Sequence, residues 1–395
     1  MMWEKRCLGD VADLCLGKML DEKKNKGGPL PYLANINVRW GEFDLGNLRE
    51  MRFEDREKER YGLKYGDIVM CEGGEPGRCS IWKENVPGMM IQKALHRIRP
   101  HACIDFSFLY YTFLLKGRAG EFAGLFTGST IKHLPREKLV KLEIQFPQLV
   151  AQKRIAEILI SYDDLIENNR RRMVLLEESA RLLYREWFVR LRFPGHESTR
   201  IVNGLPEGWR KFVFGDICTD SRETVSPESL EPDTPYIGLE HMPRRSISLS
   251  DWGTAEQVTS SKLRFSKGDI LFGKIRPYFH KVGIAFTDGV VSSDSFVIRP
   301  ATDELKSFVL LTVSSDEFIA DTSQSMKEGT KMPRADWKQM IQFPVMIPPS
   351  GLLEDFSESI EAITDQLTNL CFQNQKLRTA RDLLLPKLMS GEIEV

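Results

Sequence analysis

The stretch from Gln148 to Leu191 constrains the fold more than any other part of the chain. One set of positions in it recurs at alternating steps of four and three residues. Nine of these ten positions are apolar, whereas a chain that is 42% hydrophobic would place about four there by chance. This pattern is the heptad seam of a long helix that packs against a partner along its length. The seam consists of Ile155, Leu159, Tyr162, Ile166, Asn169, Met173, Leu176, Ala180, Leu183 and Trp187.

A second seam with the same spacing lies between Leu352 and Leu388. Each of its positions follows its counterpart by 201 residues (356 − 155 = 201, for example). Two equivalent long helices, each after a globular block, indicate a duplicated unit in which one helix is the partner of the other. The second seam consists of Phe356, Ile360, Ile363, Leu367, Leu370, Asn374, Leu377, Arg381, Leu384 and Leu388.

The blocks that precede the two helices share short sequence motifs in the same order, whereas the sequences between these motifs differ. Gly66-Asp67-Ile68 returns as Gly268-Asp269-Ile270, and Ile98-Arg99-Pro100 returns as Ile298-Arg299-Pro300. Short strands, turns and a few helices in each block favour an α+β fold over a doubly wound sheet. The elements expected in the first block include a strand that begins at Pro31, a solvated charged helix over Arg49 to Arg60, a strand over Ile68 to Cys71 and a helix over Phe106 to Lys116. One scaffold that carries two unrelated sets of loops is typical of two binding specificities on one fold.

We therefore expect an α+β chain with two repeated α/β recognition domains separated by two long helices, which form an antiparallel coiled coil. The expected segments are 1–147 for the first domain, 148–191 for the first helix, 192–206 for a linker, 207–349 for the second domain, and 350–395 for the second helix and a C-terminal tail.

The polar seam residues predict the register of the two helices. Asn169 opposite Asn374 satisfies both amides, whereas a slip of one heptad leaves each short of partners, at about 1–3 kcal/mol per group. Tyr162 then meets Arg381, whose guanidinium is expected to reach water. Pro386 lacks a backbone donor, so regular helix is expected to end near Leu385. The remaining pairs are Ile155 with Leu388, Leu159 with Leu384, Ile166 with Leu377, Met173 with Leu370, Leu176 with Leu367, Ala180 with Ile363, Leu183 with Ile360 and Trp187 with Phe356.

The composition and motifs of the sequence predict neither a metal site nor a catalytic site. A net charge of −1 neither indicates nor excludes nucleic acid, because a basic face can be balanced elsewhere. The seven cysteines form no CxxC pair and the six histidines do not fall into ligand spacing, so no metal site is predicted. No ATP-binding loop or adenine-methyltransferase motif is present, and no catalytic residue is predicted. The carboxylate pairs Asp163-Asp164 and Glu177-Glu178 are interpreted as solvated helix faces.

The apolar runs in the sequence are short. The longest, around Phe106 to Leu115, is too short to span a bilayer, and the N-terminal residues lack the apolar core of a signal peptide. We expect a cytoplasmic protein without a membrane partner.

Three phrases in the sequence resemble the specificity (S) subunits of type I restriction–modification systems. They are Gly268 to Tyr278 (GDILFGKIRPY), Phe146 to Ala156 (FPQLVAQKRIA) and Leu205 to Trp209 (LPEGW). The resemblance covers essentially the whole chain and depends on the order and spacing of the phrases. One departure is Pro348 to Leu353, where the second helix lacks the Gln-Lys-Arg-Ile stretch that the family usually repeats.

The resemblance implies a non-catalytic subunit of a type I site-specific deoxyribonuclease and adenine methyltransferase complex. In that family each variable block reads one half of a bipartite site in double-stranded DNA. The helices set the gap between the halves and dock two methyltransferase subunits, which recruit the restriction subunits. S-adenosylmethionine, ATP and Mg²⁺ are expected on those partners, and no cofactor is expected on this chain.

Loop residues with cationic or amide side chains are the candidates for DNA contact, because arginine and lysine bind phosphates, and both read base edges together with asparagine and glutamine. We expect roughly half of them to be ordinary surface residues. Arg276 has a second interpretation, as a brace for its turn between Ile275 and Pro277. The candidates are Lys18, Lys23, Lys24, Lys26, Asn37, Arg39, Arg78 and Lys132 in the first block, and Arg244, Arg245, Lys274, Arg276, His280, Lys281, Lys327 and Lys331 in the second.

Two hypotheses for the function remain open at this point. The first is a subunit that reads DNA sequence for a methylation and restriction complex. The second is a two-headed scaffold that holds a protein partner at a fixed separation without binding DNA. A monomeric enzyme is a distant third, because the catalytic motifs are missing.

Overall fold

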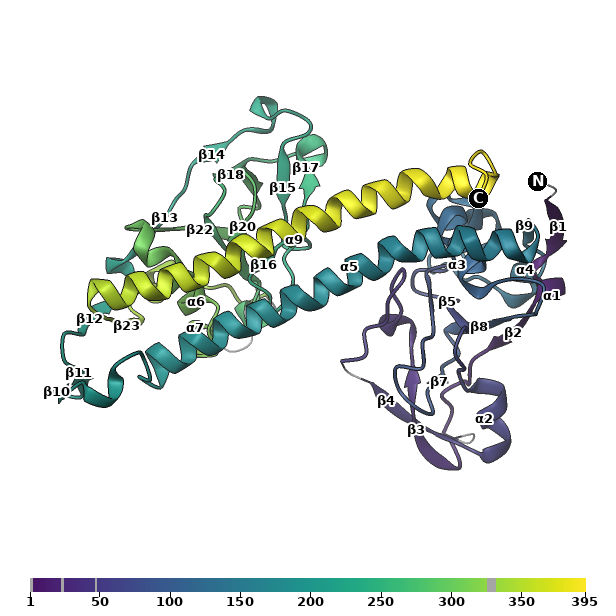
Figure 1. Ribbon diagram of the computed structural model, residues 1–395, viewed down its shortest axis with the longest axis horizontal. Coiled ribbons are helices and arrows are strands. Elements are labelled where there is room, and N and C mark those ends of the chain that lie inside the picture. The colour runs from purple at the N-terminus through teal and green to yellow at the C-terminus, as the bar shows by residue number, and fades with distance from the viewer. Residues whose placement is uncertain (1–2, 23–24, 47, 325–331) are drawn as a thin grey trace. The chain divides into compact units, whose positions relative to one another are not determined.

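The computed structural model describes residues 3–22, 25–46, 48–324 and 332–395 (Figure 1). The chain divides into two compact units. Met1–Leu165 and Lys376–Val395 form unit 1, and Ile166–Gln375 form unit 2. Because each boundary falls inside a long helix, both units contain segments of both helices, and each unit is described separately below.

Unit 1 contains a four-stranded and a three-stranded sheet, with the strand orders β2-β8-β5-β6 and β4-β3-β7, and a β1-β9 pair. Helix α3 (Phe106–Arg118) begins at Asp105, whose carboxylate accepts hydrogen bonds from the Ser107 and Phe108 backbone N–H groups. The strands are β1 (Glu4–Cys7), β2 (Ala12–Leu16), β3 (Gly28–Leu33), β4 (Arg49–Phe53), β5 (Ile68–Cys71), β6 (Cys79–Ile81), β7 (Met90–Ile91), β8 (Leu95–Pro100) and β9 (Glu143–Phe146). The shorter helices are α1 (Leu8–Val11), α2 (Asp55–Tyr61) and α4 (Arg136–Leu139).

Unit 2 contains two five-stranded sheets, with the strand orders β13-β22-β19-β20-β16 and β14-β18-β21-β15-β17, and the pairs β10-β11 and β12-β23. Its helices are α6 (Lys306–Val313), α7 (Asp316–Gln324) and α8 (Trp337–Met340). The strands are β10 (Ile201–Val202), β11 (Leu205–Pro206), β12 (Arg210–Val213), β13 (Cys218–Asp220), β14 (Thr224–Val225), β15 (Pro235–Ile237), β16 (Ser248–Leu249), β17 (Gly253–Thr254), β18 (Lys262–Phe265), β19 (Ile270–Gly273), β20 (Val282–Ala285), β21 (Gly289–Val291), β22 (Ser295–Pro300) and β23 (Pro344–Ile347).

The sheets confirm the duplication at the level of single residue pairs. Ile68 lies opposite Ile98 in unit 1, and Ile270 lies opposite Ile298 in unit 2. Ile68 and Ile270 are each preceded by a buried aspartate, which binds an arginine of the neighbouring strand. The Asp67–Arg99 contact is 2.7 Å and the Asp269–Arg299 contact is 2.9 Å. The side-chain hydrogen bond to the aspartate raises the pKa of each arginine.

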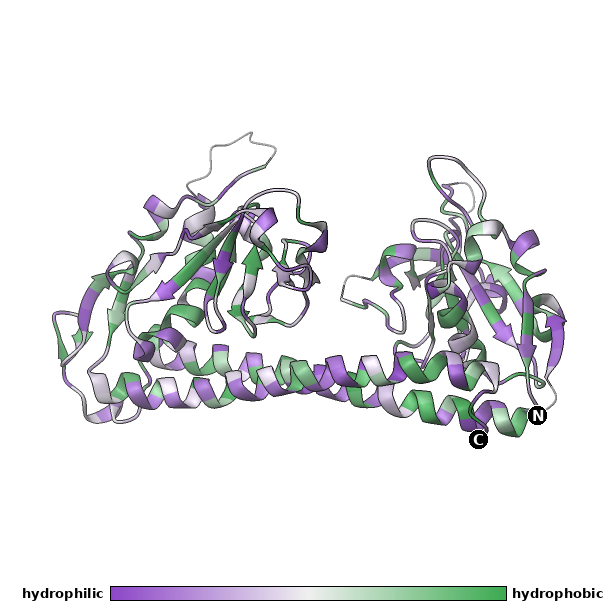
Figure 2. Ribbon diagram, turned by 90° about the horizontal axis from the view of Figure 1, so that it is seen from above, coloured by the Kyte–Doolittle hydropathy of each residue, from purple (hydrophilic) through white to green (hydrophobic). Residues whose placement is uncertain are grey.

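Helices α5 (Leu149–Tyr184) and α9 (Ser350–Ser390) supply the seam residues, and hydrophobic residues recur along both (Figure 2). In unit 1, Ile155 and Leu159 of α5 share a core with Leu385 and Leu388 of α9. In unit 2 the seam residues Met173, Ala180, Trp187, Phe356, Ile360, Leu367 and Leu370 belong to one core. The helices therefore pair antiparallel, because the first part of α5 packs with the end of α9 in unit 1 and the last part of α5 packs with the first part of α9 in unit 2. A π-helical segment, Arg185–Val189, continues α5.

Helix α9 does not end near Leu385 as predicted. It runs through Pro386 to Ser390. Pro386 is exposed, while Leu385 and Leu388 on either side are about 1% exposed in the core of unit 1. Burial of these two leucines holds the last turns helical despite the missing backbone donor.

Three further expectations are corrected by the structure. The charged run from Arg49 to Arg60 is not one helix, because its first part is strand β4, paired with β3. Pro31 lies near the end of a strand rather than at its start. The Arg381 guanidinium does not extend freely into water, because its side chain is only 13% exposed and pairs with Asp163 and Asp382.

Candidate nucleic-acid interface

The first domain places several of its predicted DNA contacts inside the fold. Lys18 is 3% exposed, and its ammonium lies 2.6 Å from Glu57 and 2.9 Å from the Arg52 carbonyl. It also lies 4.9 Å from the centre of the Phe53 ring. Burial raises the pKa of Glu57, but hydrogen bonds from Lys18 and from the Glu54 N–H lower it overall. Lys18 therefore stabilises the domain, and we exclude it from the proposed interface.

The side chains of three further candidates, Asn37, Arg39 and Arg78, also make hydrogen bonds or ion pairs to nearby residues of the first domain. The Asn37 amide accepts from the Ala34 N–H and donates to the Asp44 carbonyl, both at 2.9 Å. Arg39 donates to the Ile36 and Val38 carbonyls at 2.7 and 3.1 Å. Arg78 pairs with Glu75 at 2.7 Å, and its side chain is 12% exposed. These three side chains therefore stabilise the conformation of the loops that carry them.

The remaining candidates of the first domain are lysines. Lys26 and Lys132 are exposed, and within the part of the chain that the structure describes neither has an ion-pair partner. Both are therefore free to bind phosphate. Lys23 and Lys24 lie outside the described residues. Trp40, which the sequence reasoning passed over, is 38% exposed beside Arg39 and offers an aromatic surface.

The second domain presents a tight loop between β19 and β20. Arg276 and His280 flank the short helical turn Pro277–Phe279, and both have left-handed backbones, with φ of 51° and 50°. Such conformations are costly for residues other than glycine, and they concentrate at functional sites. Arg276 is exposed, and its guanidinium lies 5.9 Å from the centre of the Phe279 ring and has no ion-pair partner among the described residues. Its backbone N–H donates to the Pro333 carbonyl at 2.8 Å. Tyr278, at 46% exposure, is a further candidate that the sequence reasoning missed.

The equivalent position of the first domain is a glycine. Ile275 bridges to Arg334 and is followed by Arg276, while Gly73 bridges to His133 and is followed by Gly74. Gly74 has φ of 84°, and a Cβ there would lie 2.4 Å from the Asn35 amide nitrogen. The second domain thus carries an arginine at a turn position where the first has the residue best suited to it. The strained backbone at Arg276 thus accompanies an exposed guanidinium, which a glycine at this position would lack.

The loop that carries Arg244 packs on the β19–β20 loop. The Arg244 guanidinium lies 3.8 Å from the centre of the Phe279 ring. Arg245 binds Asp316 at 2.9 Å and donates to His280 Nε2 at 3.2 Å. Burial, and then the charge of Arg245, lower the pKa of His280, so this buried imidazole braces the loop as a neutral acceptor.

Lys274 and Lys281 lie at the base of the same loop. Lys274 donates to the Ser293 carbonyl at 2.8 Å and covers the Phe296 ring, and Lys281 donates to the Leu239 carbonyl. Burial lowers the pKa of both lysines. Lys327 and Lys331 lie outside the described residues. Of the predicted contacts in this domain that the structure describes, the exposed ones are therefore Arg244, Arg245 and Arg276, which lie on two adjoining loops.

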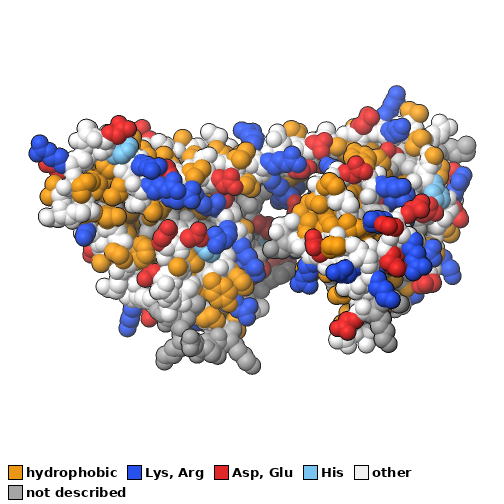
Figure 3. Space-filling model, turned by 90° about the horizontal axis from the view of Figure 1, so that it is seen from below, with side chains coloured by type: hydrophobic (Ala, Val, Ile, Leu, Met, Phe, Trp, Pro, Cys, Tyr) orange, Lys and Arg blue, Asp and Glu red, His pale blue; other side chains and the backbone are white. Residues whose placement is uncertain are grey.

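The surface charge is mixed. Figure 3 shows lysine and arginine side chains interspersed with acidic and hydrophobic ones on the face drawn. Among the described residues, no cluster of three or more His, Cys, Asp or Glu could hold a metal ion. None of the described helices is long and apolar enough to cross a membrane.

The fold and the loops define a duplicated protein, in which one α+β scaffold occurs twice with different surface residues. Residues 2–178 match the family described as Type I restriction modification DNA specificity domain. The chain is 22% identical over its whole length to the MjaIX type I restriction enzyme specificity subunit of Methanocaldococcus jannaschii, covering 94% of that protein. It is 24% identical to the EcoDI specificity subunit of Escherichia coli, over 73% of this chain and 70% of that one.

A solved structure supports the fold independently. The S subunit of a type I restriction–modification system from M. genitalium matches with a TM-score of 0.58 and 18% identity, over 98% of this chain and 96% of that one. The expected fold, two repeated α/β domains with two long helices, is confirmed. The chain is related to the specificity subunits of type I restriction–modification systems, which confirms the resemblance noted in the sequence.

Proposed function

We propose that the chain is the DNA-reading subunit of a type I restriction–modification complex and that each domain reads one half of a bipartite site. The observation that carries this proposal is the duplication itself. The strand register and the Asp–Arg pair are repeated, while the loop residues differ, as with Gly74 and Arg276. Two unlike loop sets on one scaffold are suited to two unlike half-sites.

The long helices are suited to set the gap between the half-sites. Helix α5 has 36 residues, which at about 1.5 Å per residue gives a rod of roughly 54 Å. Major-groove sites on one face of DNA recur about every 34–36 Å. A helix of this length can therefore span at least one turn of the duplex. We further propose that the helix pair docks two methyltransferase subunits, which bring the restriction subunits.

The chemistry is proposed to lie on those partners. S-adenosylmethionine would bind the methyltransferase subunits, and ATP and Mg²⁺ the restriction subunits. This chain would contribute sequence recognition and no catalytic group. The names of the relatives favour this function over the protein scaffold, for which no contact in the structure gives separate support.

The test is to sequence methylated bases in host DNA with and without the gene. The proposal expects one bipartite adenine-methylated motif that disappears on deletion, and purified chain alone that transfers no methyl group. A methylation pattern unchanged by deletion would contradict it, as would methyl transfer by the chain alone. A catalytically inactive methyltransferase partner serves as the control, because it abolishes methylation while leaving DNA binding by the complex.

A further inference from the structure

Glu177 of helix α5 places a carboxylate beneath the second recognition domain. The residue is 5% exposed. Its Oε1 accepts from the Ser246 hydroxyl at 2.7 Å, the Ser248 hydroxyl at 2.6 Å and the Ser248 N–H at 3.2 Å. Its Oε2 accepts from the Ile247 N–H at 3.3 Å. A buried carboxylate with this many donors fixes the segment that supplies them.

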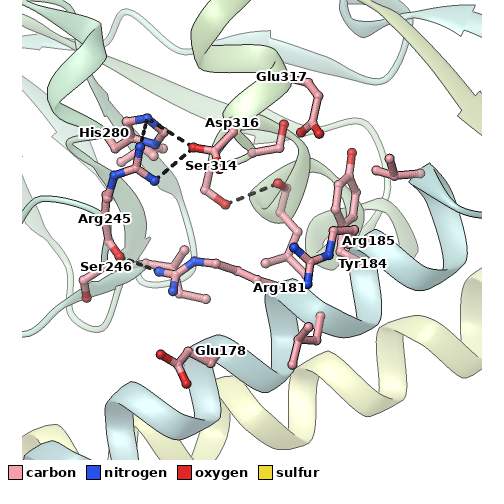
Figure 4. Close-up of a pocket in the computed structure, with 16 residues that line it drawn as sticks. Glu178, Arg181, Tyr184, Arg185, Arg245, Ser246, His280, Ser314, Asp316 and Glu317 are labelled. Carbon is pink, nitrogen blue, oxygen red and sulfur yellow. Dashed lines mark hydrogen bonds and ion pairs between the residues drawn. The ribbon is translucent and has the colours of Figure 1, made fainter.

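Arg181, one turn further along α5, extends this attachment. Its guanidinium binds Glu177 Oε2 at 3.0 Å and also donates to the Arg245 carbonyl, as Figure 4 shows for the second contact. The Arg245 side chain in turn binds Asp316 and His280. A cavity of about 400 Å³ lies beside this attachment and is lined by Arg181, Arg245, His280 and Asp316, together with further arginine and carboxylate side chains (Figure 4). The segment 244–248 is therefore held from the helix on one side and from the recognition loop on the other.

The two loops joined in this way carry Arg244, Arg245 and Arg276, the exposed residues among the predicted contacts of the second domain that the structure describes. Arg244 lies on the ring of Phe279, and Phe279 belongs to the turn that follows Arg276. A shift of residues 246–248 would therefore move Arg244 and, through Phe279, the loop that presents Arg276 and Tyr278. Base recognition needs contacts held within about 0.5 Å, so such a shift would alter which bases are accepted.

We propose that Glu177 is a positioning residue for base recognition by the second domain, and that it acts by holding Ser246 to Ser248 against helix α5. Glu177 touches no DNA in this arrangement, since its carboxylate is enclosed. The inference rests on the proposed function, because it concerns how the same DNA-reading surface is aimed. It assigns part of the sequence specificity to a residue of the long helix rather than to the loops alone.

A general structural role and a positioning role give different measurements. A variant that is partly unfolded binds every DNA sequence less well by the same factor, because fewer molecules are competent. A variant with a displaced loop changes the ratio of affinities between sequences. The informative quantity is therefore the discrimination between cognate and single-mismatch half-sites, measured separately for each half.

The experiment compares Glu177→Gln with Glu178→Gln in the full chain bound to its methyltransferase partner. Glu178 is the matched control, because it is adjacent, exposed and lines the same cavity, while its side chain has no hydrogen bond to residues 246–248 among the described contacts. A duplex library randomised at each half-site is selected for binding and sequenced. Proteins that read bases discriminate single mismatches by roughly 5- to 150-fold. In Glu177→Gln we expect this ratio to fall by a factor of about three or more in the second half-site only.

Each outcome is decisive. Unchanged discrimination in Glu177→Gln, or an equal loss in both half-sites, overturns the inference while the proposed function stands. A wild-type complex that enriches no sequence overturns the proposed function and the inference with it. If Glu177→Gln does not fold, Ser248→Ala removes one hydroxyl donor and leaves the others, and it must show the same loss confined to the second half-site. Glu178→Gln is expected to match the wild type throughout.

Discussion

The side-chain amide of Asn169 donates a hydrogen bond to the side-chain oxygen of Asn374 at 3.0 Å, and both residues are buried. This is the contact that the sequence predicted for the register of the helix pair. Trp187 and Phe356 meet in the same register, with ring centres 5.6 Å apart. The predicted register is confirmed in unit 2, where a polar pair within an apolar seam excludes slipped alternatives.

Replacing one member of the asparagine pair should destabilise the chain. Asn169→Leu removes the donor that Asn374 uses and leaves a buried amide oxygen unpaired, which we expect to lower the free energy of unfolding by about 1–3 kcal/mol. The double variant Asn169→Leu with Asn374→Leu should recover most of that loss, because neither polar group remains. Urea unfolding of the single and double variants measures both effects. A double variant as unstable as the sum of the singles would contradict this account.

The Lys18–Glu57 pair should make the stability of the first domain depend on pH. The folded-state pKa of Glu57 is lowered from its ordinary value of 4.5, so its contribution is present above that value and is lost as the pH falls through the folded pKa. Glu57→Gln should weaken this dependence and destabilise the domain by about 1–3 kcal/mol at pH 7. Glu59→Gln, an exposed neighbour in α2, is the control. Thermal unfolding between pH 7 and pH 3 compares them.

We expect Arg276 to increase the affinity for DNA and to lower the stability of the second domain. Arg276→Gly relieves the left-handed backbone and should raise the free energy of unfolding by about 0.5–1 kcal/mol, while it removes a free cation from the proposed interface. Arg276→Ala removes the cation but keeps the strain, so it should lose affinity with no gain in stability. Calorimetry and DNA-binding titrations at two salt concentrations separate the effects. Unchanged affinity in both variants would remove Arg276 from the interface.

Exchange of the first domain should change one half-site. If residues 1–147 are replaced by the equivalent block of another specificity subunit, we expect a new first half-site and an unchanged second half-site. The physical reason is that the loops of the second domain are held by their own residues and by Glu177 of helix α5, all of which lie outside the exchanged block. Sequencing of methylated bases measures both halves together, and the reciprocal exchange of residues 207–349 is the control. Simultaneous change of both halves would show that the domains do not read independently.

Lengthening both helices should lengthen the gap in the DNA target. One heptad inserted into α5 near Leu165 and one into α9 near Lys376 keeps the seam in phase and adds about 10 Å. With about 3.4 Å per base pair, we expect a gap roughly three base pairs longer, with the same half-sites. Seven residues inserted into the 192–206 linker are the control and should leave the gap unchanged. An unchanged gap after the helix insertion would remove the ruler role.

The sequence predicts best what depends on local periodicity. The seams, the strand Ile68–Cys71 and the helix from Phe106 follow from spacing and turn residues that lie within a few positions of one another. The prediction that Arg49 to Arg60 form one helix is wrong for its first half, because strand pairing with β3 overrides a charged, helix-like composition.

The candidate site is harder to predict, because exposure is decided by tertiary packing. Lys18 and Lys26 look alike in the sequence, yet one is enclosed by Glu57 and Phe53 and the other is exposed. Two acidic residues were wrongly interpreted as solvated for the same reason. Glu177 is enclosed by Ser246 to Ser248, and Asp163 accepts from the Tyr111 hydroxyl at 2.7 Å and pairs with Arg381. Their partners come from distant parts of the chain, which no local pattern reveals.

The core of unit 1 has a consequence for how the protein is made. Ile155 and Leu159 bury their side chains with Leu385 and Leu388, which lie far along the chain. At about 5–20 residues per second, a ribosome needs on the order of 10–45 s to pass from Leu159 to Leu385. During that interval Ile155 and Leu159 can pack against the first domain, whose Phe108 and Leu114 belong to the same core, but the α9 side of that core is missing. The first domain emerges early and its core is completed only near the end of translation, so a chaperone that covers the unpaired side of Ile155 and Leu159 would act in this window.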